Sequence, residues 1–429
     1  MKKLFIAAVA LAAACGCFAS DYRQAVRDVP ARAGGVYYAY PEDGLSAEYQ
    51  LPKGYEPFYV SHYGRHGSRF LISDNDYKRV VDRLDDAHKA GALTPAGEKL
   101  RLQMDTIWQE ARGRGGELTP LGARQHHEIA KRMATAYPDV FATPDADVTA
   151  VSTQVMRCAH SMFNFIDGLK ELNPQLNVPM ESSQRNLIYL SNHAPASAEL
   201  GRATGPWYQD YKRFKAAKTK PERLMATIFS DKKYVDTWVD TEALMWDLYY
   251  IAIDLQNMET DIELLPLFTN DELFGLWEVF NFNFYACNSS YPRAHGLHLA
   301  NARNLLRHII ENADKYIADG KHGATLRFGH DSNIIPLLAL MKVEGCYSDA
   351  ERPEDLSRDY ADFYICPMAT NLQLVFFRPT KGSDDVLVRI LHNEKDAVLP
   401  VQRAETGTST IYYRWSDLRP YLTSLAYSE

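Results

Sequence analysis

Two arginines flank a histidine in Arg65-His66-Gly67-Ser68-Arg69, directly after an apolar run, Phe58–Tyr63, that predicts a buried strand. Cations so close together repel one another unless an anion lies between them. Guanidinium groups bind phosphate through paired hydrogen bonds, and their charge keeps a neighbouring imidazole neutral and able to attack phosphorus. We therefore predict that Arg65 and Arg69 bind a phosphate group and that His66 is a nucleophile. A solvated basic turn is the alternative.

A second polar group, His330-Asp331-Ser332-Asn333, follows another strand pattern, Thr325–Phe328. An apolar helix pattern, Ile334–Met341, comes next, and we expect Pro336 in its first turn. Asp331, Ser332 and Asn333 are all side chains that cap helices well, so one of them is expected to be the N-cap. For Asp331 the alternative to a role in catalysis is therefore a helix cap.

A third group lies between these two in the chain. Residues 148–152 alternate like a strand, and a helix pattern that opens at Thr153 and runs to about Leu169 carries Arg157 near its start. On its residue type alone, Arg157 is equally well an ordinary surface arginine. All three groups lie just past expected strand ends, where open α/β sheets bind their ligands. We therefore expect them to form one site.

These motifs resemble those of the histidine phosphatase superfamily, whose signature is Arg-His-Gly-x-Arg. His330-Asp331-Ser332-Asn333 is similar to the His-Asp-Thr-Asn motif of the histidine acid phosphatase branch, and residues 116–122 resemble its Leu-Thr-Pro-x-Gly segment. The context of Arg157 resembles Ser-Thr-x-x-x-Arg-x-x-x-Ser. The resemblance covers residues 57 to 400 and implies hydrolysis of phosphate esters without a metal or another cofactor. It implies a phosphohistidine at His66, a proton donor at Asp331, and phosphate binding by Arg65, Arg69, Arg157 and His330.

Within that family the chain resembles the group of phytases and multiple inositol polyphosphate phosphatases. It departs from the latter at His330-Asp331-Ser332, where they carry His-Ala-Glu, and the proton donor is placed as in bacterial phytases and glucose-1-phosphatases. Phe70 also replaces a proline that many members have. We expect an inositol polyphosphate such as phytate as the substrate, and Lys78 and Arg79 are either cations at the pocket mouth or part of a solvated helix face.

Three alternatives of function stay open beside this expectation. A general or sugar-phosphate acid phosphatase would share every catalytic residue. A non-catalytic phosphate-binding protein and a phosphotransferase similar to phosphoglycerate mutase are the other two. The sequence has no Gly-x-x-x-x-Gly-Lys-Ser/Thr and no Gly-x-Ser-x-Gly motif, which argues against a P-loop or a serine hydrolase.

Strand and helix patterns alternate before residue 180 and return after 324, whereas the region between is mostly helical. We therefore expect an α/β fold, in which residues 20–184 and 320–429 form a core sheet similar to that of phosphoglycerate mutase. Residues 185–319 would be an inserted helical cap domain. Residues 20–56 are expected to be an irregular N-terminal arm. Two late strands, Leu372–Arg378 and Val386–His392, are expected to form a hairpin.

The first 19 residues have the pattern of a bacterial signal peptide, with two lysines, an apolar run and small residues before Ala19. We expect export to the periplasm or beyond, and lipid attachment at Cys15 or Cys17 is the less favoured alternative. Loss of the two lysines would change the formal net charge from −8 to −10. An acidic protein is a poor partner for nucleic acid. No further segment is apolar enough to span a membrane, and we expect a monomer.

Four cysteines remain after the leader, and an oxidising compartment permits three disulfide pairings among Cys158, Cys287, Cys346 and Cys366. We favour a Cys346–Cys366 disulfide, because it closes a short loop. Four free thiols are the alternative. A zinc site is not expected, since neither Cys-x-x-Cys nor His-Glu-x-x-His occurs.

Overall fold

The computed structural model describes residues 22–428 except 43–44, 46–47, 144, 192 and 383–384. The predicted signal peptide, with Cys15 and Cys17, lies outside the described residues, so cleavage and lipid attachment stay predictions. In the described part, one mixed sheet has the strand order β3-β2-β4-β1-β5-β6-β7, and β8 pairs with β6. The strands are β1 (Tyr55–Arg65), β2 (Asp147–Ser152), β3 (Met180–Glu181), β4 (Gly323–Gly329), β5 (Asn371–Pro379), β6 (Leu387–His392), β7 (Lys395–Asp396) and β8 (Tyr413–Arg414).

The sheet has a parallel half and an antiparallel half that meet at β1. Strands β2 and β4 run parallel to each other and β4 runs parallel to β1, whereas β5 is antiparallel to β1. Strands β5 and β6 pair antiparallel as neighbours in the chain, so the predicted hairpin is confirmed. The α/β fold class is confirmed as well.

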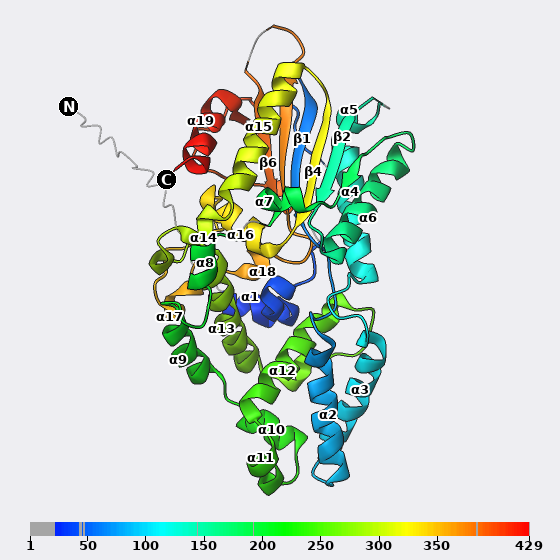
Figure 1. The fold of residues 1–429 in the computed structure, drawn as a ribbon, viewed down its shortest axis with the longest axis vertical. Helices are drawn as coiled ribbons and strands as arrows, with labels where there is room; N and C mark the ends of the chain where they lie inside the picture. The colour runs from blue at the N-terminus through cyan, green and yellow to red at the C-terminus, as the bar shows by residue number, and fades with distance from the viewer. Residues whose placement is uncertain are drawn as a thin grey trace, which may run out of the picture.

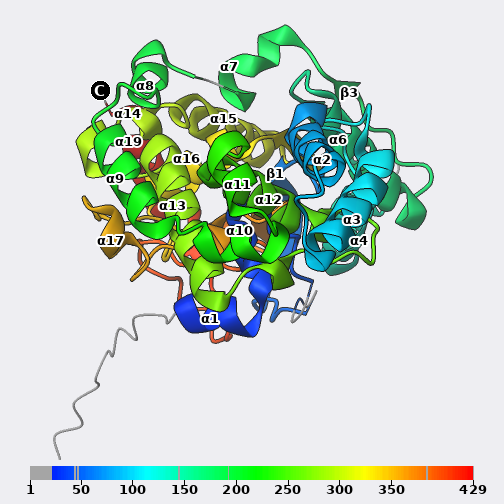
Figure 2. The same ribbon diagram turned by 90° about the horizontal axis from the view of Figure 1, so that it is seen from below.

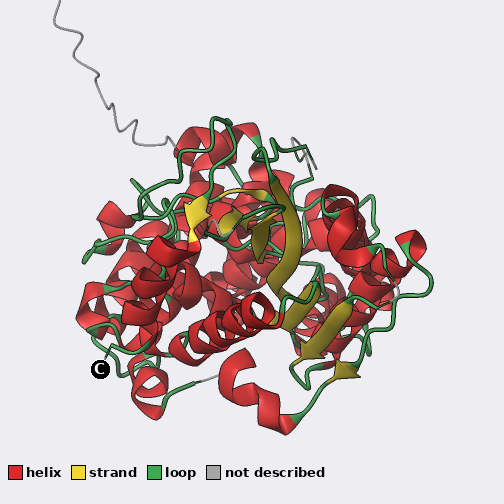
Figure 3. Cartoon of the chain, turned by 90° about the horizontal axis from the view of Figure 1, so that it is seen from above, coloured by secondary structure: helices red, strands yellow, loops and turns green. Residues whose placement is uncertain are grey.

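Helices cover both faces of the sheet (Figure 3), which is why its central strands β1 and β4 are buried along almost their whole length. Successive residues of β1 point to opposite faces. Tyr59 packs on Tyr316 of α15 with ring centroids 4.0 Å apart, whereas Val60 joins a cluster with Ile129 of α4 and Phe165 of α6. The helices that flank the sheet are α4 (Pro120–Ala136), α5 (Pro138–Phe141), α6 (Met156–Leu172), α15 (Arg303–Asp319), α16 (Asp331–Leu340) and α19 (Trp415–Ala426).

A second, helical region lies at the end of the molecule away from the body of the sheet (Figures 1 and 2). Most of it comes from the predicted insertion, but α2 (Asp74–Lys89) and α3 (Pro95–Ala111) lie there too. The backbone of Thr94 donates to Ile228 at 2.9 Å, and Arg79 of α2 binds Asp247 of α12. The division of the chain into two domains stays a prediction. Of the predicted insertion, α15 lies against the sheet, and the other helices are α7 (Leu187–Leu190), α8 (Pro195–Leu200), α9 (Tyr208–Lys218), α10 (Glu222–Ile228), α11 (Lys232–Trp238), α12 (Thr241–Asp254), α13 (Asn270–Asn288) and α14 (Leu297–Ala300).

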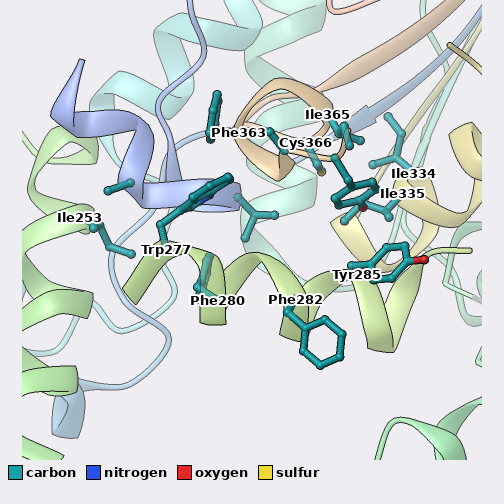
Figure 4. Packing of buried hydrophobic residues seen from close by; sticks show 14 of the residues in the cluster. Ile253, Trp277, Phe280, Phe282, Tyr285, Ile334, Ile335, Phe363, Ile365 and Cys366 are labelled. Atoms are coloured by element: carbon teal, nitrogen blue, oxygen red, sulfur yellow. The ribbon is translucent and has the colours of Figure 1, made fainter. Parts of the chain in front are cut away.

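An apolar cluster joins the helical region to the core. Figure 4 shows Trp277 and Phe280 of α13 in one group of buried side chains with Phe363 and Ile365. Phe363 and Ile365 belong to the segment of the chain between α16 and β5. The rings of Trp277 and Phe363 lie 5.2 Å apart. The segment contains two short helices, α17 (Pro353–Leu356) and α18 (Asp362–Ile365). Aromatic residues of the insertion therefore serve packing, as their helical spacing indicates.

The N-terminal arm is irregular only in part: the described residues between 38 and 54 form no helix or strand, as predicted, but residues 22–37 are mostly helical. It forms α1 (Tyr22–Asp28) and a 3₁₀ segment, η1 (Pro30–Tyr37), although glycines disfavour helix. Tertiary contacts decide here. The Tyr249 hydroxyl donates to the carbonyl of Ala33 at 2.6 Å, and Gln256 donates to that of Ala31 at 3.1 Å. The remaining short 3₁₀ segments are η2 (Gln184–Asn186), η3 (Leu255–Asn257), η4 (Leu265–Leu267) and η5 (Pro292–Ala294).

Two details of α16 also differ from the sequence prediction. The helix begins at Asp331, one turn earlier than expected, so Pro336 lies beyond its first turn. Its N-cap position is His330, which makes no side-chain cap, and none of the three predicted side chains occupies that position. The earlier start draws Asp331 into the first turn, where its Oδ1 accepts from the Ser332 amide at 2.8 Å.

The favoured Cys346–Cys366 disulfide is wrong, because all four cysteines of the described chain are free thiols. Cys346 and Cys366 are buried among apolar side chains, where a thiol packs as a small hydrophobic group. The Cys346 Sγ lies 3.7 Å from Nδ1 of His392, which gives that thiol a polar partner. No helix in the described chain combines the length and the apolar character that crossing a membrane requires.

Candidate active site

Three strand ends bring the predicted site together. Strands β1 and β4 end level with each other, since Arg65 pairs with Gly329, and Ser152 at the end of β2 is level with Phe328. The amide of His66 donates to the carbonyl of Gly329 at 3.0 Å, which continues this pairing by one residue. Segments that are about 90 and 265 residues from His66 thus meet at one edge, as the sequence predicted.

Residues 65–71, here called the Arg-His-Gly loop, pack against the start of α4. A side chain at Gly67 would place its Cβ 2.5 Å from the carbonyl of Gly122, so only glycine fits there. Thr119 is the N-cap of α4 and Pro120 follows it, and the Thr119 amide donates to the carbonyl of Ser68 at 2.9 Å. The motif around residues 116–122 therefore supports the loop.

His66 is buried and is held in one tautomer. Its Nδ1 lies 2.9 Å from the carbonyl of Gly67. A carbonyl only accepts, so Nδ1 carries the proton and Nε2 has a free lone pair. Burial lowers the pKa of His66 well below its usual value, and the charges of Arg65, Arg157 and Arg69 lower it further. The imidazole is therefore neutral, which nucleophilic attack requires.

Arg65 is fully buried and joins several parts of the chain. Its Nη1 donates to three carbonyls, those of Val36 at 2.5 Å, Cys366 at 2.9 Å and Pro367 at 3.1 Å. Its Nη2 forms a salt bridge of 2.8 Å with Asp331. Its Nε is buried and has no hydrogen-bond partner among the described residues. One donor of Arg65 is therefore available to an anion in the site.

Arg69 and Arg157 also have a buried Nε without a partner in the described chain. The guanidinium of Arg69 lies 4.6 Å from the ring centroid of Tyr37 and donates to the carbonyl of Phe70 at 2.9 Å. Burial lowers the pKa of Arg157 below its usual value, and the charge of Arg69 adds to this effect. Three arginines with unsatisfied donors surround a neutral histidine, and a bound dianion would satisfy these donors and balance their charge.

His330 and Asp331 complete the arrangement. The rings of His66 and His330 are 5.8 Å apart, and Nε2 of His330 lies 3.1 Å from the Thr153 hydroxyl. Burial lowers the pKa of His330 to about 4, against the opposing effect of the Asp331 carboxylate. Burial alone would raise the pKa of Asp331, but Arg65 and His330 outweigh it and hold this pKa below its usual value. Asp331 is thus a carboxylate while no phosphate is bound.

Lys78 and Arg79, the two cations considered for the pocket mouth, lie in different environments. Lys78 pairs with Asp82 at 2.5 Å on the exposed face of α2, as a solvated helix face would. Arg79 borders a cavity of about 280 Å³ that also touches Tyr37 and Tyr250. Its charge is opposed by Asp247 at 2.7 Å and by a second aspartate of α2 at 3.3 Å. This cavity, whose Tyr37 also contacts Arg69, is thus lined by aromatic side chains and by the two aspartates that already pair with Arg79.

Several polar residues near the loop escaped the sequence analysis. Asp254 at the end of α12 and Asn257 at the end of η3 are fully buried, and Tyr37 belongs to the N-terminal arm. The only signal was an aspartate and an asparagine within an otherwise apolar helix pattern. Within the described residues, no group of three or more His, Cys, Asp and Glu side chains is arranged to hold a metal ion.

The fold and this site agree with one family. The model of the histidine phosphatase superfamily, branch 2, matches residues 64–393, which include all six predicted site residues. The chain belongs to this branch of the histidine phosphatase superfamily, and it is a phosphatase of that class. The family identification made from the motifs is therefore confirmed.

Solved structures of low identity share the fold. The multiple inositol polyphosphate phosphatase of Bifidobacterium longum, in complex with inositol hexasulfate, is 19% identical with a TM-score of 0.70, and the match covers 91% of this chain and 97% of that one. The phytase of D. castellii is 14% identical with a TM-score of 0.62, over 93% and 85% of the two chains. The phytase of Hafnia alvei is 14% identical with a TM-score of 0.55, over 88% and 98%.

Proposed function

We propose that this phosphatase hydrolyses phosphate monoesters through a phosphohistidine at Nε2 of His66, with inositol polyphosphates such as phytate as its substrates. The observation that carries the proposal is the convergence of two buried arginines, Arg65 and Arg69, and the half-buried Arg157 on a neutral histidine with a free Nε2, since each of the three has a buried Nε without a partner in the described chain. Arg65, Arg69, Arg157 and His330 would hold the non-bridging oxygens and stabilise the charge that shifts to them in the transition state.

The reaction would proceed in two steps. Nε2 of His66 forms a bond to phosphorus as the bond from phosphorus to the ester oxygen breaks, and Asp331 gives its proton to the departing alkoxide. Water then attacks the phosphohistidine while Asp331 takes up a proton from it. Asp331 is a carboxylate without ligand, because Arg65 lowers its pKa. A bound phosphate dianion competes for Arg65 and adds a like charge, and both effects favour the protonated carboxyl that the first step needs.

The choice of substrate rests on the resemblance of the motifs and on the names of the solved structures that share the fold. A sugar-phosphate or general acid phosphatase remains the second candidate. The paired state of Arg79 and the aromatic lining of the adjacent cavity favour it, since a polyphosphate needs more free cations than this cavity offers.

Phosphate release from phytate, glucose 1-phosphate and nitrophenyl phosphate at low salt separates these candidates. The proposal expects the highest kcat/KM on phytate and a decrease of this preference as salt rises, because contacts with spare phosphates are electrostatic. A higher kcat/KM on glucose 1-phosphate would identify a sugar phosphatase. Binding of inorganic phosphate without any turnover would identify the non-catalytic alternative.

The place of action is a further part of the proposal. The signal-peptide pattern in residues 1–19 supports export to the periplasm or the medium, and we propose that the exported protein is a monomer. Cell fractionation and the molar mass of the purified protein in solution would test the two statements separately.

A further inference from the structure

The residues on both sides of Arg69 are held by one short stretch of the insertion, the end of α12 and the segment η3 that follows it. Ser68 precedes Arg69, and its hydroxyl donates to Oδ1 of Asn257 at 2.7 Å. Leu71 follows two positions later, and its amide donates to the hydroxyl of Tyr77 at 2.9 Å. That hydroxyl in turn donates to Oδ2 of Asp254 at 2.9 Å.

The Asn257 side chain also binds the backbone of Tyr37, whose ring lies against the Arg69 guanidinium. Its Nδ2 donates to the carbonyl of Tyr37 at 2.8 Å and to Oδ1 of Asp254 at 3.3 Å. Ser68 has no freedom to turn away, because its Oγ accepts from Nε2 of Gln125 at 2.9 Å. The Ser68 proton must therefore point toward Asn257.

This network is buried, and the side-chain amide of Asn257 donates two hydrogen bonds and accepts one. Asn257 and Asp254 have no exposed surface, and both carboxylate oxygens of Asp254 accept hydrogen bonds. A buried polar network of this kind fixes one geometry, since loss of a member leaves its partners unpaired. Burial raises the pKa of Asp254 to about 6, and the nearby charge of Arg69 opposes this rise.

We propose that Asn257 and Asp254 are positioning residues of the phosphatase site, which set the direction of the Arg69 guanidinium through Ser68, Tyr37 and Tyr77. Neither residue touches the phosphate itself. The helical insertion thereby completes the phosphate site of the core, in addition to covering it. The inference rests on the proposed function, because it assigns Arg69 to a phosphate oxygen.

A double-mutant cycle with Arg69 tests this inference. Asn257→Ala is made in the natural protein and in an Arg69→Ala background, and kcat/KM is measured on nitrophenyl phosphate. Misplacement of a binding group by about 1 Å costs roughly tenfold to a hundredfold in rate. We expect a loss of this size in the natural protein and less than about a twofold loss when Arg69 is already absent, because residues that act together are not additive.

A second measurement does not depend on turnover. Inorganic phosphate should raise the melting temperature of the natural protein, since a ligand that binds the folded state stabilises it. Asn257→Ala should reduce this rise, but should not reduce it further once Arg69 is absent. Asp254→Asn keeps an acceptor for Tyr77, so it should reduce the stabilisation by phosphate less than Asn257→Ala does. If Asn257→Ala does not fold, Asp254→Asn takes its place in the double-mutant cycle.

The matched control is Thr219→Val. Thr219 accepts a buried hydrogen bond of 3.0 Å from Trp246, and both residues belong to the insertion. The control should lower the melting temperature while leaving kcat/KM and the effect of phosphate unchanged. Equal losses from Asn257→Ala with and without Arg69, or an unchanged effect of phosphate, would overturn the inference. If phosphate stabilises the natural protein but no ester is hydrolysed, the proposed function fails and the stabilisation cycle still decides the positioning role.

Discussion

Arg65 and Asp331 are 266 positions apart in the chain and form a salt bridge of 2.8 Å at the ends of β1 and β4. The arginine is completely buried, whereas the aspartate side chain retains 23% of its exposure. Under the proposed function, a phosphate bound beside Arg65 would compete with Asp331 for the same guanidinium. The salt bridge would then couple substrate binding to protonation of the Asp331 carboxyl.

Asp331→Asn should impair esters with poor leaving groups far more than activated esters. An inositol alkoxide needs a proton to depart, whereas a nitrophenolate hardly does. We expect kcat on phytate to fall by about a hundredfold or more, and kcat on nitrophenyl phosphate to fall much less. Equal losses on the two substrates would mean that Asp331 serves only the first turn of α16.

His66→Ala should abolish turnover and leave phosphate binding largely intact, because the side chain supplies the nucleophile and the arginines remain. We expect a loss of at least about a thousandfold in kcat, as for other removed nucleophiles. Rapid acid-free quenching with labelled substrate should trap acid-labile, base-stable phosphate on the natural protein and none on the variant. Residual hydrolysis above that level would contradict the phosphohistidine route.

Asp362 should make the fold less stable as pH rises. It is buried beside Trp277, whose Nε1 donates to it at 2.9 Å, and burial raises its pKa from 3.8 to about 7. The folded protein therefore keeps a proton that the unfolded chain loses, so this contribution to stability is present below pH 3.8 and is lost as pH rises toward 7.

Asp362→Asn keeps the acceptor for Trp277 and removes the titration. We expect its free energy of unfolding by urea to depend less on pH between about 4 and 7 than that of the natural protein. The difference between the two proteins isolates Asp362 from every other titrating group. Asp359→Asn, at an exposed site, controls for the change in net charge. Parallel curves for Asp362→Asn and the natural protein would show that the carboxyl is ionised at all these pH values.

Asp247→Asn should improve activity on polyphosphates. Asp247 binds Arg79 at 2.7 Å beside the cavity that Tyr37 lines, so its removal would leave Arg79 with only the longer contact of 3.3 Å to Asp76 and more able to bind a spare phosphate. An exposed ion pair is worth up to about 1 kcal/mol, and we expect kcat/KM on phytate to rise roughly threefold at low salt. Nitrophenyl phosphate should show no change, and neither should Lys78→Met on either substrate. A fall in activity on phytate would place its spare phosphates elsewhere.

Chelation by EDTA should leave activity unchanged. Arg65, Arg69 and Arg157 supply the positive charge that a metal ion brings to other phosphatases. The measurement is the initial rate after dialysis against EDTA, with and without added zinc or magnesium. A loss that one of these ions restores would contradict the proposed chemistry.

The sequence was most informative where a position accepts only one or a few residue types. Only glycine fits at position 67, because α4 begins against it, and the pair Thr119 and Pro120 is typical of the start of a helix, which is where the structure has it. Strand ends were predictable from apolar runs, and the rule that ligands bind beyond the carboxyl ends of strands then placed His66 and Asp331 at one edge of the sheet.

Long-range contacts account for what the sequence could not predict. The segment η1 contains two glycines and is held in place by hydrogen bonds from α12, more than 200 positions away. Asn257 looked like one polar residue in an apolar helix, and only the fold brings it next to Ser68. The partner of a buried thiol is equally a matter of tertiary packing, which is why the short loop between Cys346 and Cys366 misled the prediction.

The carbonyl of Val36 bears on how the chain can be shortened. It accepts from Nη1 of Arg65, so a peptide group of the N-terminal arm forms part of the wall behind the nucleophile. A protease that cut after η1 and released the arm would uncover the core side chains that pack on Val26, Ala33 and Val36. The arginine would at the same time lose one of its three carbonyl partners. Proteolytic trimming at this end should therefore lower the stability of the fold and disturb the site together.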